Sequence, residues 1–330
     1  MSDAEPIWLR EAEVAKLLAL DEAIDVLEAG LRVEGRGGAH GMAKTHVELP
    51  GGGGLHALGA SHDADRFAGT KTWAHTAGGA TPLLLIWSSG TGALVAVIEA
   101  FALGQMRTGA MTGVATRWLA RPDADELAQI GTGKQALTQV AAVAAVRRLR
   151  RVRVYSPTAA HRSNFAERLH ASGLGVGVLD CWSVDQALDG ASLVTVATRA
   201  RAPIVAARQL AAGAHVNAIG AITSERAELA QDVFPRCARI AVDVLQAAHE
   251  LSAELVAYDA WSQVQPLAEL IARAERRPEG ADLTLFKAMG SGVADLALGL
   301  EVIARARRVG AGRPIPPPER ARVRLRSEES

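Results

Sequence analysis

The feature that most constrains the fold is a regular order of short apolar runs, glycine turns and helical runs that begins after Pro122. The expected strands cover residues 126–130, 151–155, 176–179, 193–197, 215–219, 240–243 and 283–289. The expected helices of this part cover residues 135–149, 160–171 and 293–307. Strands that alternate with helices at this spacing are typical of a doubly wound parallel sheet, so we expect the α/β class.

A glycine turn lies between the first strand and the first helix of this alternation. Its residues follow the pattern G-x-G-x-x-A and are Gly131, Thr132, Gly133, Lys134, Gln135 and Ala136. The first glycine permits a tight turn, the second lets the backbone approach a pyrophosphate, and the alanine lets helix and strand pack closely. An isolated match is more often an ordinary turn, but its place between strand and helix favours a Rossmann turn in which residues 131–135 bind a dinucleotide.

The end of the second strand bears on the choice of dinucleotide. NAD-binding chains usually carry Asp or Glu there, because the carboxylate binds the ribose hydroxyls. This chain has Ser156 instead, followed by Thr158 and Arg162. A carboxylate would repel a 2′-phosphate, whereas these three side chains could hold one. We therefore predict NADPH, with NADH less favoured; Arg162 could alternatively be a solvent-facing residue of its helix.

The part before Pro122 has a different texture. A helical pattern over residues 11–31 precedes β-like runs at 45–49, 55–58, 70–74, 83–87 and 93–98, which Gly-rich turns separate, and a second helical pattern covers 99–120. These runs predict an antiparallel sheet. We expect an α+β substrate-binding and dimerisation domain at 1–122 and a Rossmann domain at 123–307. The Pro- and Arg-rich tail, about 308–330, is expected to pack back on the first domain.

Charge and hydropathy exclude several classes of function. Lys and Arg together number 36, as do Asp and Glu, so the formal net charge is zero. Nucleic-acid binding and polybasic membrane binding both need a cationic face, which this balance disfavours. We find no apolar stretch of the roughly 18 residues that a membrane span requires. We expect a soluble cytoplasmic protein with no nucleic-acid or membrane partner.

Cysteine and histidine usage points away from metal or disulfide chemistry. Cys181 and Cys237 are the two cysteines, and they have no ligand or disulfide-framework spacing. The nine histidines, among them His56, His62 and His75, show no metal-ligand spacing with a carboxylate partner. We therefore predict no metal site.

Several motifs, in their order and spacing, resemble the ornithine cyclodeaminase and mu-crystallin family over nearly the whole chain. They are Gly69-Thr70-Lys71, Thr91-Gly92-Ala93-Leu94, Arg107-Thr108-Gly109-Ala110, the turn at 131–136, His215-Val216-Asn217-Ala218-Ile219-Gly220, and Met289-Gly290 followed by Asp295. The resemblance implies a homodimer of two-domain subunits, with substrate residues and a dimer sheet in the first domain and a Rossmann fold in the second.

The resemblance also assigns expected roles to single residues. Lys71 stands where the family has its substrate-facing lysine, and Arg107 where it has the arginine near substrate carboxylate and cofactor. Lys44 replaces an earlier carboxylate-binding arginine, so a point charge stands where the family has a bidentate fork. Met289 matches a substrate-lining position. Cofactor-side positions of the family match Thr81, Thr198, Gly220 and Gly290.

The family contains cyclodeaminases, reductases, dehydrogenases and crystallins, and one departure helps to choose among them. Cyclodeaminases and related alanine dehydrogenases carry an aspartate where this chain has Ile222. Its absence favours an NADPH-dependent reductase of imino acids, or an amino-acid dehydrogenase in reverse, acting on a small carboxylate-bearing imine. The alternatives are an ornithine- or lysine-type cyclodeaminase and a nonenzymatic NADPH-dependent small-ligand binder.

The proposed chemistry requires Lys71 to exchange a proton. To exchange a proton near neutral pH its pKa must be lowered, which desolvation and the charges of Arg107 and Lys44 could do. Asp295, near the start of the last helix, is expected to cap that helix or form a salt bridge rather than act in catalysis.

Overall fold

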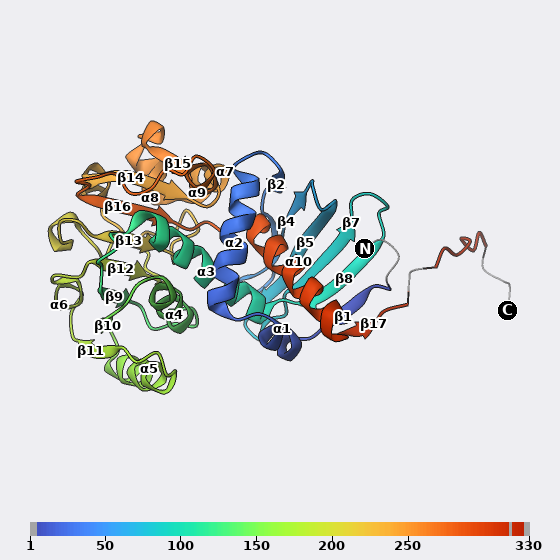
Figure 1. Cartoon of the computed structure of the whole chain (residues 1–330), viewed down its shortest axis with the longest axis horizontal. Helices are drawn as coiled ribbons and strands as arrows, with labels where there is room; N and C mark the ends of the chain where they lie inside the picture. The colour runs from blue at the N-terminus through green and yellow to red at the C-terminus, as the bar shows by residue number, and fades with distance from the viewer. Residues whose placement is uncertain (1–4, 317–318, 327–330) are drawn as a thin grey trace.

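The computed structural model describes residues 5–316 and 319–326 and contains two β-sheets with helices between and around them (Figure 1). The strands of the first sheet are β1 (Ile7–Leu9), β2 (Ala39–Gly41), β3 (Thr45–Leu49), β4 (Gly53–His62), β5 (Phe67–Thr76), β6 (Gly79–Ala80), β7 (Leu83–Ser88), β8 (Leu94–Glu99) and β17 (Arg313–Pro314). Those of the second are β9 (Glu126–Ile130), β10 (Arg151–Tyr155), β11 (Gly177–Cys181), β12 (Leu193–Val196), β13 (His215–Ala218), β14 (Cys237–Val242), β15 (Val264–Pro266) and β16 (Leu283–Lys287).

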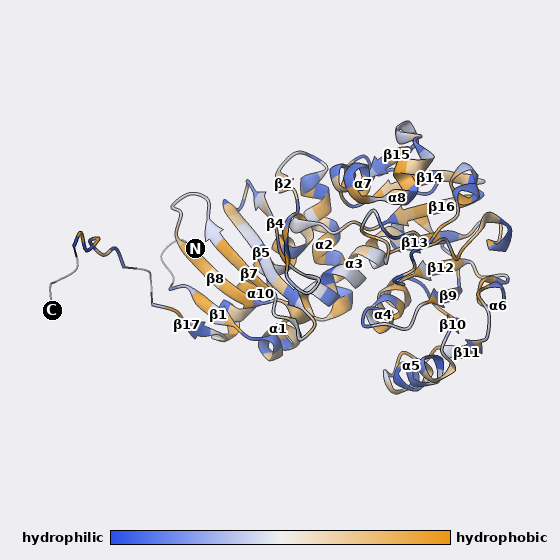
Figure 2. Ribbon diagram, turned by 180° about the vertical axis from the view of Figure 1, so that it is seen from behind, coloured by the Kyte–Doolittle hydropathy of each residue, from blue (hydrophilic) through white to orange (hydrophobic). Residues whose placement is uncertain are grey.

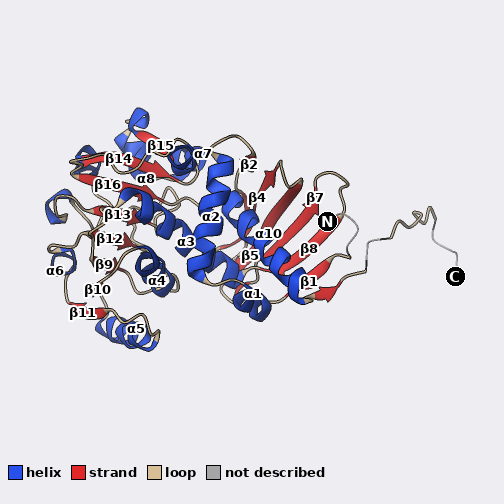
Figure 3. Cartoon of the chain, in the orientation of Figure 1, coloured by secondary structure: helices blue, strands red, loops and turns tan. Residues whose placement is uncertain are grey.

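The helices connect and cover these sheets, as Figure 3 shows by colour. The α-helices are α1 (Glu11–Leu17), α2 (Leu20–Glu34), α3 (Phe101–Leu119), α4 (Ala136–Val146), α5 (Ala159–Ala171), α6 (Val184–Leu188), α7 (Leu245–Leu251), α8 (Ala253–Tyr258), α9 (Leu267–Ala272) and α10 (Gly292–Val309). Short 3₁₀ helices are η1 (Ala207–Gln209), η2 (Gln231–Arg236) and η3 (Trp261–Gln263).

The second sheet has the order β11-β10-β9-β12-β13-β16-β14-β15, and every strand pair in it is parallel. Alternate residues of its strands enter different cores: Leu127 of β9 packs with α4 and α5, and its neighbour Ala128 packs on the opposite face. A parallel sheet that is buried on both faces is the doubly wound arrangement, which confirms the α/β fold expected from the alternation.

The first sheet has the order β17-β1-β8-β7-β5-β4-β2, with β3 and β6 as side branches. Its central pairs are antiparallel, as the sequence predicts, but β1 pairs with β8 in parallel. Helix α10 packs closely against β4, β5 and β7. A side chain at Gly292 would collide with Gly59, and one at Gly299 would collide with Leu84. Figure 2 shows the apolar strands of this sheet in orange.

Two predicted helices differ from the structure by more than two residues, and the others differ by one or two at an end. The pattern at 11–31 is not one helix, since Leu18 and Ala19 have extended backbones and separate α1 from α2. Leu18 is buried, so the apolar spacing continues through the break and conceals it, while the Glu22 carboxylate accepts the Ala19 N–H and starts α2. The helix expected at 135–149 ends at Val146, where Arg147 turns extended and donates to carbonyls at the end of α3.

The chain after α10 returns to the first sheet. Arg313 and Pro314 pair antiparallel with Trp8 and Ile7 of β1. Beyond β17, residues 315–316 and 319–326 form no helix or strand. Pro317 and Pro318 of the Pro-rich run lie outside the described residues.

Candidate active site

The glycine turn lies where the parallel sheet meets its first helix, at the carboxyl end of β9. Gly131 has φ +99°, and a side chain there would meet the Ala197 carbonyl oxygen at 2.5 Å. The position of a side chain at Gly133 is open, with no atom within 4 Å. Ala136 is fully buried at the start of α4. The turn therefore has the tight bend, open backbone and close helix packing that a bound pyrophosphate needs.

The end of β10 carries the residues predicted to select the cofactor. Arg162 of α5 is not solvent-facing: its Nη1 donates to the Ser156 carbonyl oxygen at 2.8 Å, and its Nε donates to Asp180 Oδ1 at 2.5 Å. Ser156 is buried, and Thr158 stands at the N-cap of α5 without a side-chain capping bond. Asp180, near the end of β11, is a carboxylate that the sequence reasoning missed.

Thr198 and Gly220, at the ends of the adjacent β12 and β13, are joined by a buried glutamate. Glu228 Oε1 accepts the Thr198 N–H at 2.7 Å and its hydroxyl at 2.8 Å, and Oε2 accepts the Gly220 N–H at 2.9 Å. Burial raises the Glu228 pKa, and the positive charge of Lys287 opposes this increase. Glu228 therefore fixes two neighbouring loops, and no sequence motif signals it.

A second carboxylate, that of Glu254, holds the backbone of Glu228 in place. Glu254 Oε1 accepts the backbone N–H of Glu228 at 2.6 Å, while Glu254 Oε2 lies 2.5 Å from Lys287 Nζ. Both side chains of this ion pair are almost fully buried. Lys287, Glu254 and Glu228 thus form a buried chain of interactions that anchors the loops after β12 and β13.

Three elements at the first sheet contribute a charged cluster, and one of them, α10, comes from the end of the chain. Lys71 of β5 places Nζ 2.6 and 2.7 Å from the two oxygens of Asp295, in the first turn of α10. Arg107 of α3 has Nε 3.5 Å from the same carboxylate. Asp295 forms the expected salt bridge but does not cap α10, because Ser291 does so. One carboxylate therefore joins two cations predicted from the sequence.

The cluster has more positive than negative charge, which affects Lys71. Burial, together with the charges of Arg107 and Lys44, lowers the Lys71 pKa to about 8 against the opposing attraction of Asp295. Lys44, in the loop between β2 and β3, is half-buried, and burial together with Arg107 lowers its pKa. The lowered Lys71 pKa is the direction expected from the sequence, and the charge of Arg107 acts on Lys44 as well as on Lys71.

The segment after β16 approaches Arg107. Asp243 is buried and accepts the Met289 N–H at 2.7 Å and the Gly290 N–H at 2.8 Å. Gly290 has φ +104°, and a side chain there would lie 3.8 Å from Arg107 Nη1. Asp243, which the sequence analysis did not identify, thus holds a glycine turn against the cluster.

A cavity of about 220 Å³ joins this cluster to the phosphate turn. Lys71 and Arg107 line it from the first domain, and Lys134 and Gln135 line it from the turn. Trp73 and Phe101 supply aromatic walls. Thr81 is exposed and stands between two lining residues, Ala80 and Pro82, without itself lining the cavity. The arrangement holds fixed cations beside an apolar wall and the open turn.

No group of three or more His, Cys, Asp or Glu side chains among the described residues could hold a metal ion. In the same residues, no helix is both long and apolar enough to cross a membrane. Cys181 and Cys237 are free and buried.

A doubly wound domain with an open phosphate turn, facing a cationic cluster on a second sheet, defines the class of two-domain dinucleotide-binding folds. The sequence model described as the ornithine cyclodeaminase/mu-crystallin family matches residues 4–309. The chain belongs to this family.

Individual relatives agree with that assignment. Delta(1)-pyrroline-2-carboxylate reductase of Bacillus cereus is 29% identical over 229 residues, which are 67% of this chain and 70% of that protein. The solved structure of the Thermococcus litoralis enzyme of that name, with NADH and L-proline, has a TM-score of 0.86 and 25% identity and covers 94% of this chain and 100% of its own. An archaeal alanine dehydrogenase dimer with bound NAD has a TM-score of 0.86 and 26% identity, covering 94% and 99%.

Proposed function

We propose that this protein is a nicotinamide-dependent reductase of imino acids, which reduces a C=N bond next to a carboxylate. The observation that carries the proposal is the cavity in which Lys71 and Arg107 face the phosphate turn at Lys134 and Gln135. Relatives with names of imino-acid reductases support this reaction class. The same site would serve an amino-acid dehydrogenase in the reverse direction.

The residues of the turn fit a dinucleotide. Gly133 leaves room for a pyrophosphate against the backbone, and Gln135 Oε1 is a buried acceptor without a hydrogen-bond partner in the described chain. Gly131 to Gln135 would hold the phosphates, and Thr198, Gly220 and Gly290 would border the rest of the cofactor. When bound, the nicotinamide ring supplies hydride to the substrate's imine carbon.

The charged cluster would bind and protonate the substrate. Arg107, with Lys44 beside it, would hold the substrate carboxylate by charge-assisted hydrogen bonds. Lys71, with its pKa lowered to about 8, keeps a proton at neutral pH that it can share with the imine nitrogen. Asp295 holds the Lys71 ammonium in position from the side. Met289 would line the substrate space.

We propose NADPH as the preferred form of the cofactor. Arg162 uses Nε and Nη1 on Asp180 and Ser156, and in the described chain its Nη2 has no hydrogen-bond partner, so this nitrogen could meet a 2′-phosphate. Asp180 opposes this preference by its charge. The test is Arg162→Ala, which should raise KM for NADPH at least about tenfold and leave KM for NADH nearly unchanged. A larger effect on NADH would contradict the assignment.

The reaction itself is tested with the full chain against cyclic imines carrying a carboxylate, and against 2-oxo acids mixed with amines. Loss of reduced-cofactor absorbance is expected with at least one of these substrates. Lys71→Met should lower kcat by about a hundredfold or more while cofactor binding persists. Near-normal turnover of this variant would remove Lys71 from the mechanism.

Two other results would replace the proposed reaction. Release of ammonia from ornithine or lysine without net cofactor consumption would make the protein a cyclodeaminase, although Ile222 stands where that activity's aspartate is expected. Tight cofactor binding without oxidation across the whole panel would make it a ligand-binding protein.

We also infer that the protein is a homodimer. The archaeal alanine dehydrogenase is described as a dimer. In this chain, Met42, Val47 and Leu55 are large apolar side chains that are exposed at one edge of the first sheet. A second copy that covers this edge would remove them from water.

A further inference from the structure

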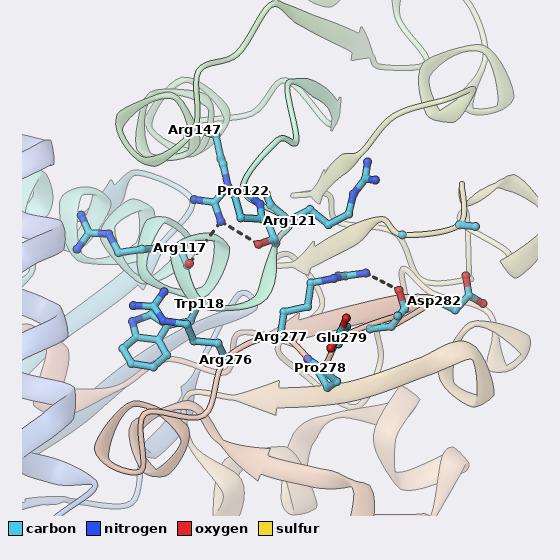
Figure 4. Close-up of a pocket in the computed structure, with 15 residues that line it drawn as sticks. Arg117, Trp118, Arg121, Pro122, Arg147, Arg276, Arg277, Pro278, Glu279 and Asp282 are labelled. Atoms are coloured by element: carbon cyan, nitrogen blue, oxygen red, sulfur yellow. Dashed lines mark hydrogen bonds between the residues drawn. The ribbon is translucent and has the colours of Figure 1, made fainter.

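A second cavity, of about 770 Å³, lies near the amino ends of the Rossmann strands, at the edge of the sheet opposite the phosphate turn. Its walls come from the end of α3, the linker to β9, the start of the loop after α4, and the segment before β16 (Figure 4). The turn follows the carboxyl end of β9, whereas Gly213 and Asp282 precede the amino ends of β13 and β16. This cavity is therefore separate from the candidate active site.

Arginine dominates the lining of this second cavity. The five arginines are Arg117, Arg121, Arg147, Arg276 and Arg277, against the two acids Glu279 and Asp282. Arg236, which is outside the lining, holds Asp282 through two hydrogen bonds of 2.8 and 2.9 Å. Glu279 is exposed. The walls thus carry a local excess of positive charge within a chain of zero net charge.

Two of these arginines donate hydrogen bonds to backbone carbonyl groups at the end of α3. Arg147 Nη2 donates to the Thr116 and Ala120 oxygens at 2.9 Å, and Arg277 Nη1 donates to the Leu119 oxygen at 3.2 Å. These bonds supply donors to carbonyls at the end of α3, where the last carbonyls have no donor within the helix. A helix C-terminus carries only about half a negative charge, so the two full charges are not neutralised there.

The remaining arginines include one that no carboxylate holds. The Arg276 guanidinium lies 4.4 Å from the centre of the Trp118 ring. Among the described residues, no carboxylate lies within salt-bridge distance of Arg147, Arg276 or Arg277, although Arg277 is attracted by Asp282 at longer range. Arg117 does pair, with Asp25 and Glu28 of α2, and exposed Arg121 lies 3.7 Å from Asp123.

The cations in this cavity also repel one another. Burial, followed by the charges of Arg117 and Arg276, lowers the Arg147 pKa, and burial with the charge of Arg121 lowers the Arg277 pKa. An anion placed among them would relieve this repulsion. Guanidinium groups present planar forks that match phosphate oxygens, and the volume is in the range of small-molecule sites.

We propose that this cavity binds a small polyanion that carries phosphate groups. Arg121 and Arg276 would contact it directly, because both are exposed and neither is needed for the carbonyl bonds of α3. Arg147 and Arg277 would contribute charge from the wall. The buried Trp118 indole N–H, which has no partner among the described residues, is a further donor at this wall.

The test is calorimetric titration of the full chain with inorganic triphosphate at physiological ionic strength. The Gly133→Asp background places a carboxylate in the open phosphate turn, so the probe cannot report that site. We expect binding to this protein, weakened at least about tenfold by Arg121→Gln with Arg276→Gln.

Arg148→Gln is the matched control, since Arg148 is exposed beside Arg147 but does not line the cavity. It should leave the affinity unchanged, and thermal melting should show that all variants fold. The proposal is overturned if millimolar triphosphate produces no binding heat in the Gly133→Asp protein. It is also overturned if Arg148→Gln weakens binding as much as the paired substitutions do.

Discussion

At the scale of single residues, the site depends on one carboxylate between two cations. Asp295 is almost fully buried, as is Lys71, and the pair would be costly to bury if either charge stood alone. The Lys71 pKa of about 8 is the result of burial set against this attraction. The pair therefore sets the pH range in which Lys71 carries its proton.

Replacing Asp295 tests this coupling. Wild-type activity should fall as the pH rises through about 8, because Lys71 loses the proton it shares with the substrate. Asp295→Asn removes the attraction and should move this alkaline limb to lower pH. The measurement is kcat/KM as a function of pH, with Glu48→Gln on exposed β3 as a control that leaves the limb in place. An unshifted limb in Asp295→Asn would show that another group titrates.

Glu34, at the end of α2, gives a separate prediction for stability. Burial, with the charge of Asp243, raises its pKa to about 7, and its Oε2 has no partner in the described chain. The folded protein binds this proton more tightly than the unfolded chain does. The stabilisation that the proton contributes is therefore fully present below pH 4.5 and is lost as the pH rises through 7.

Glu34→Gln should abolish this decline. Above pH 7 it should raise the free energy of unfolding by roughly 3 kcal/mol at most, and below pH 4.5 it should change little. Denaturant unfolding at several pH values measures the difference, and Glu48→Gln is again the control. An equal effect of Glu34→Gln at all pH values would point to packing rather than proton binding.

At the scale of elements, the existence and order of the buried strands were predictable, but their ends often differ by one to three residues, and helix ends were less predictable still. Strands 126–130 and 151–155 agree with β9 and β10, because short apolar runs between polar flanks mark where a strand is buried. The break at Leu18 was missed because tertiary packing buries the residue that interrupts the helix. Strand β15 was missed because its three residues carry no periodic signal.

The glycine turn supports a prediction with an internal control. Gly131→Ala should destabilise the protein by at least about 2 kcal/mol, because its φ is positive and the added carbon would meet the Ala197 oxygen. Gly133→Ala has open space and should fold normally, but the methyl group would crowd a pyrophosphate and weaken cofactor binding. Thermal melting and cofactor titration separate the two effects, and equal stability of the two variants would contradict this account.

At the scale of the whole molecule, the candidate site could be predicted only in part. Lys71 and Asp295 are 224 positions apart, so no local pattern brings them together. The family resemblance indicated Lys71, Arg107 and the turn, since those segments form motifs. Glu228, Asp243 and Asp180 act through backbone bonds or distant partners, and no motif marks them.

The proposed homodimer gives a prediction at the same scale. Val47→Asp with Leu55→Asp places charges on the exposed apolar edge of the first sheet, and should convert the dimer to a folded monomer. Light scattering coupled to size exclusion measures the mass. Val323→Asp, an exposed apolar position in the tail, is the control and should stay dimeric. Retention of the dimer by the double variant would place the interface elsewhere.

Helix α3 lines both cavities, which would couple the two sites. It carries Arg107 in the wall of one cavity and Arg117 in the wall of the other, ten residues or about 15 Å along its axis. Between these two arginines, Gly109 packs closely against Thr138 of α4 and Gly113 packs closely against Ile24 of α2. An anion that shifts α3 at one end would alter substrate affinity at the other. By thermodynamic reciprocity, substrate would then change the anion's affinity by the same factor.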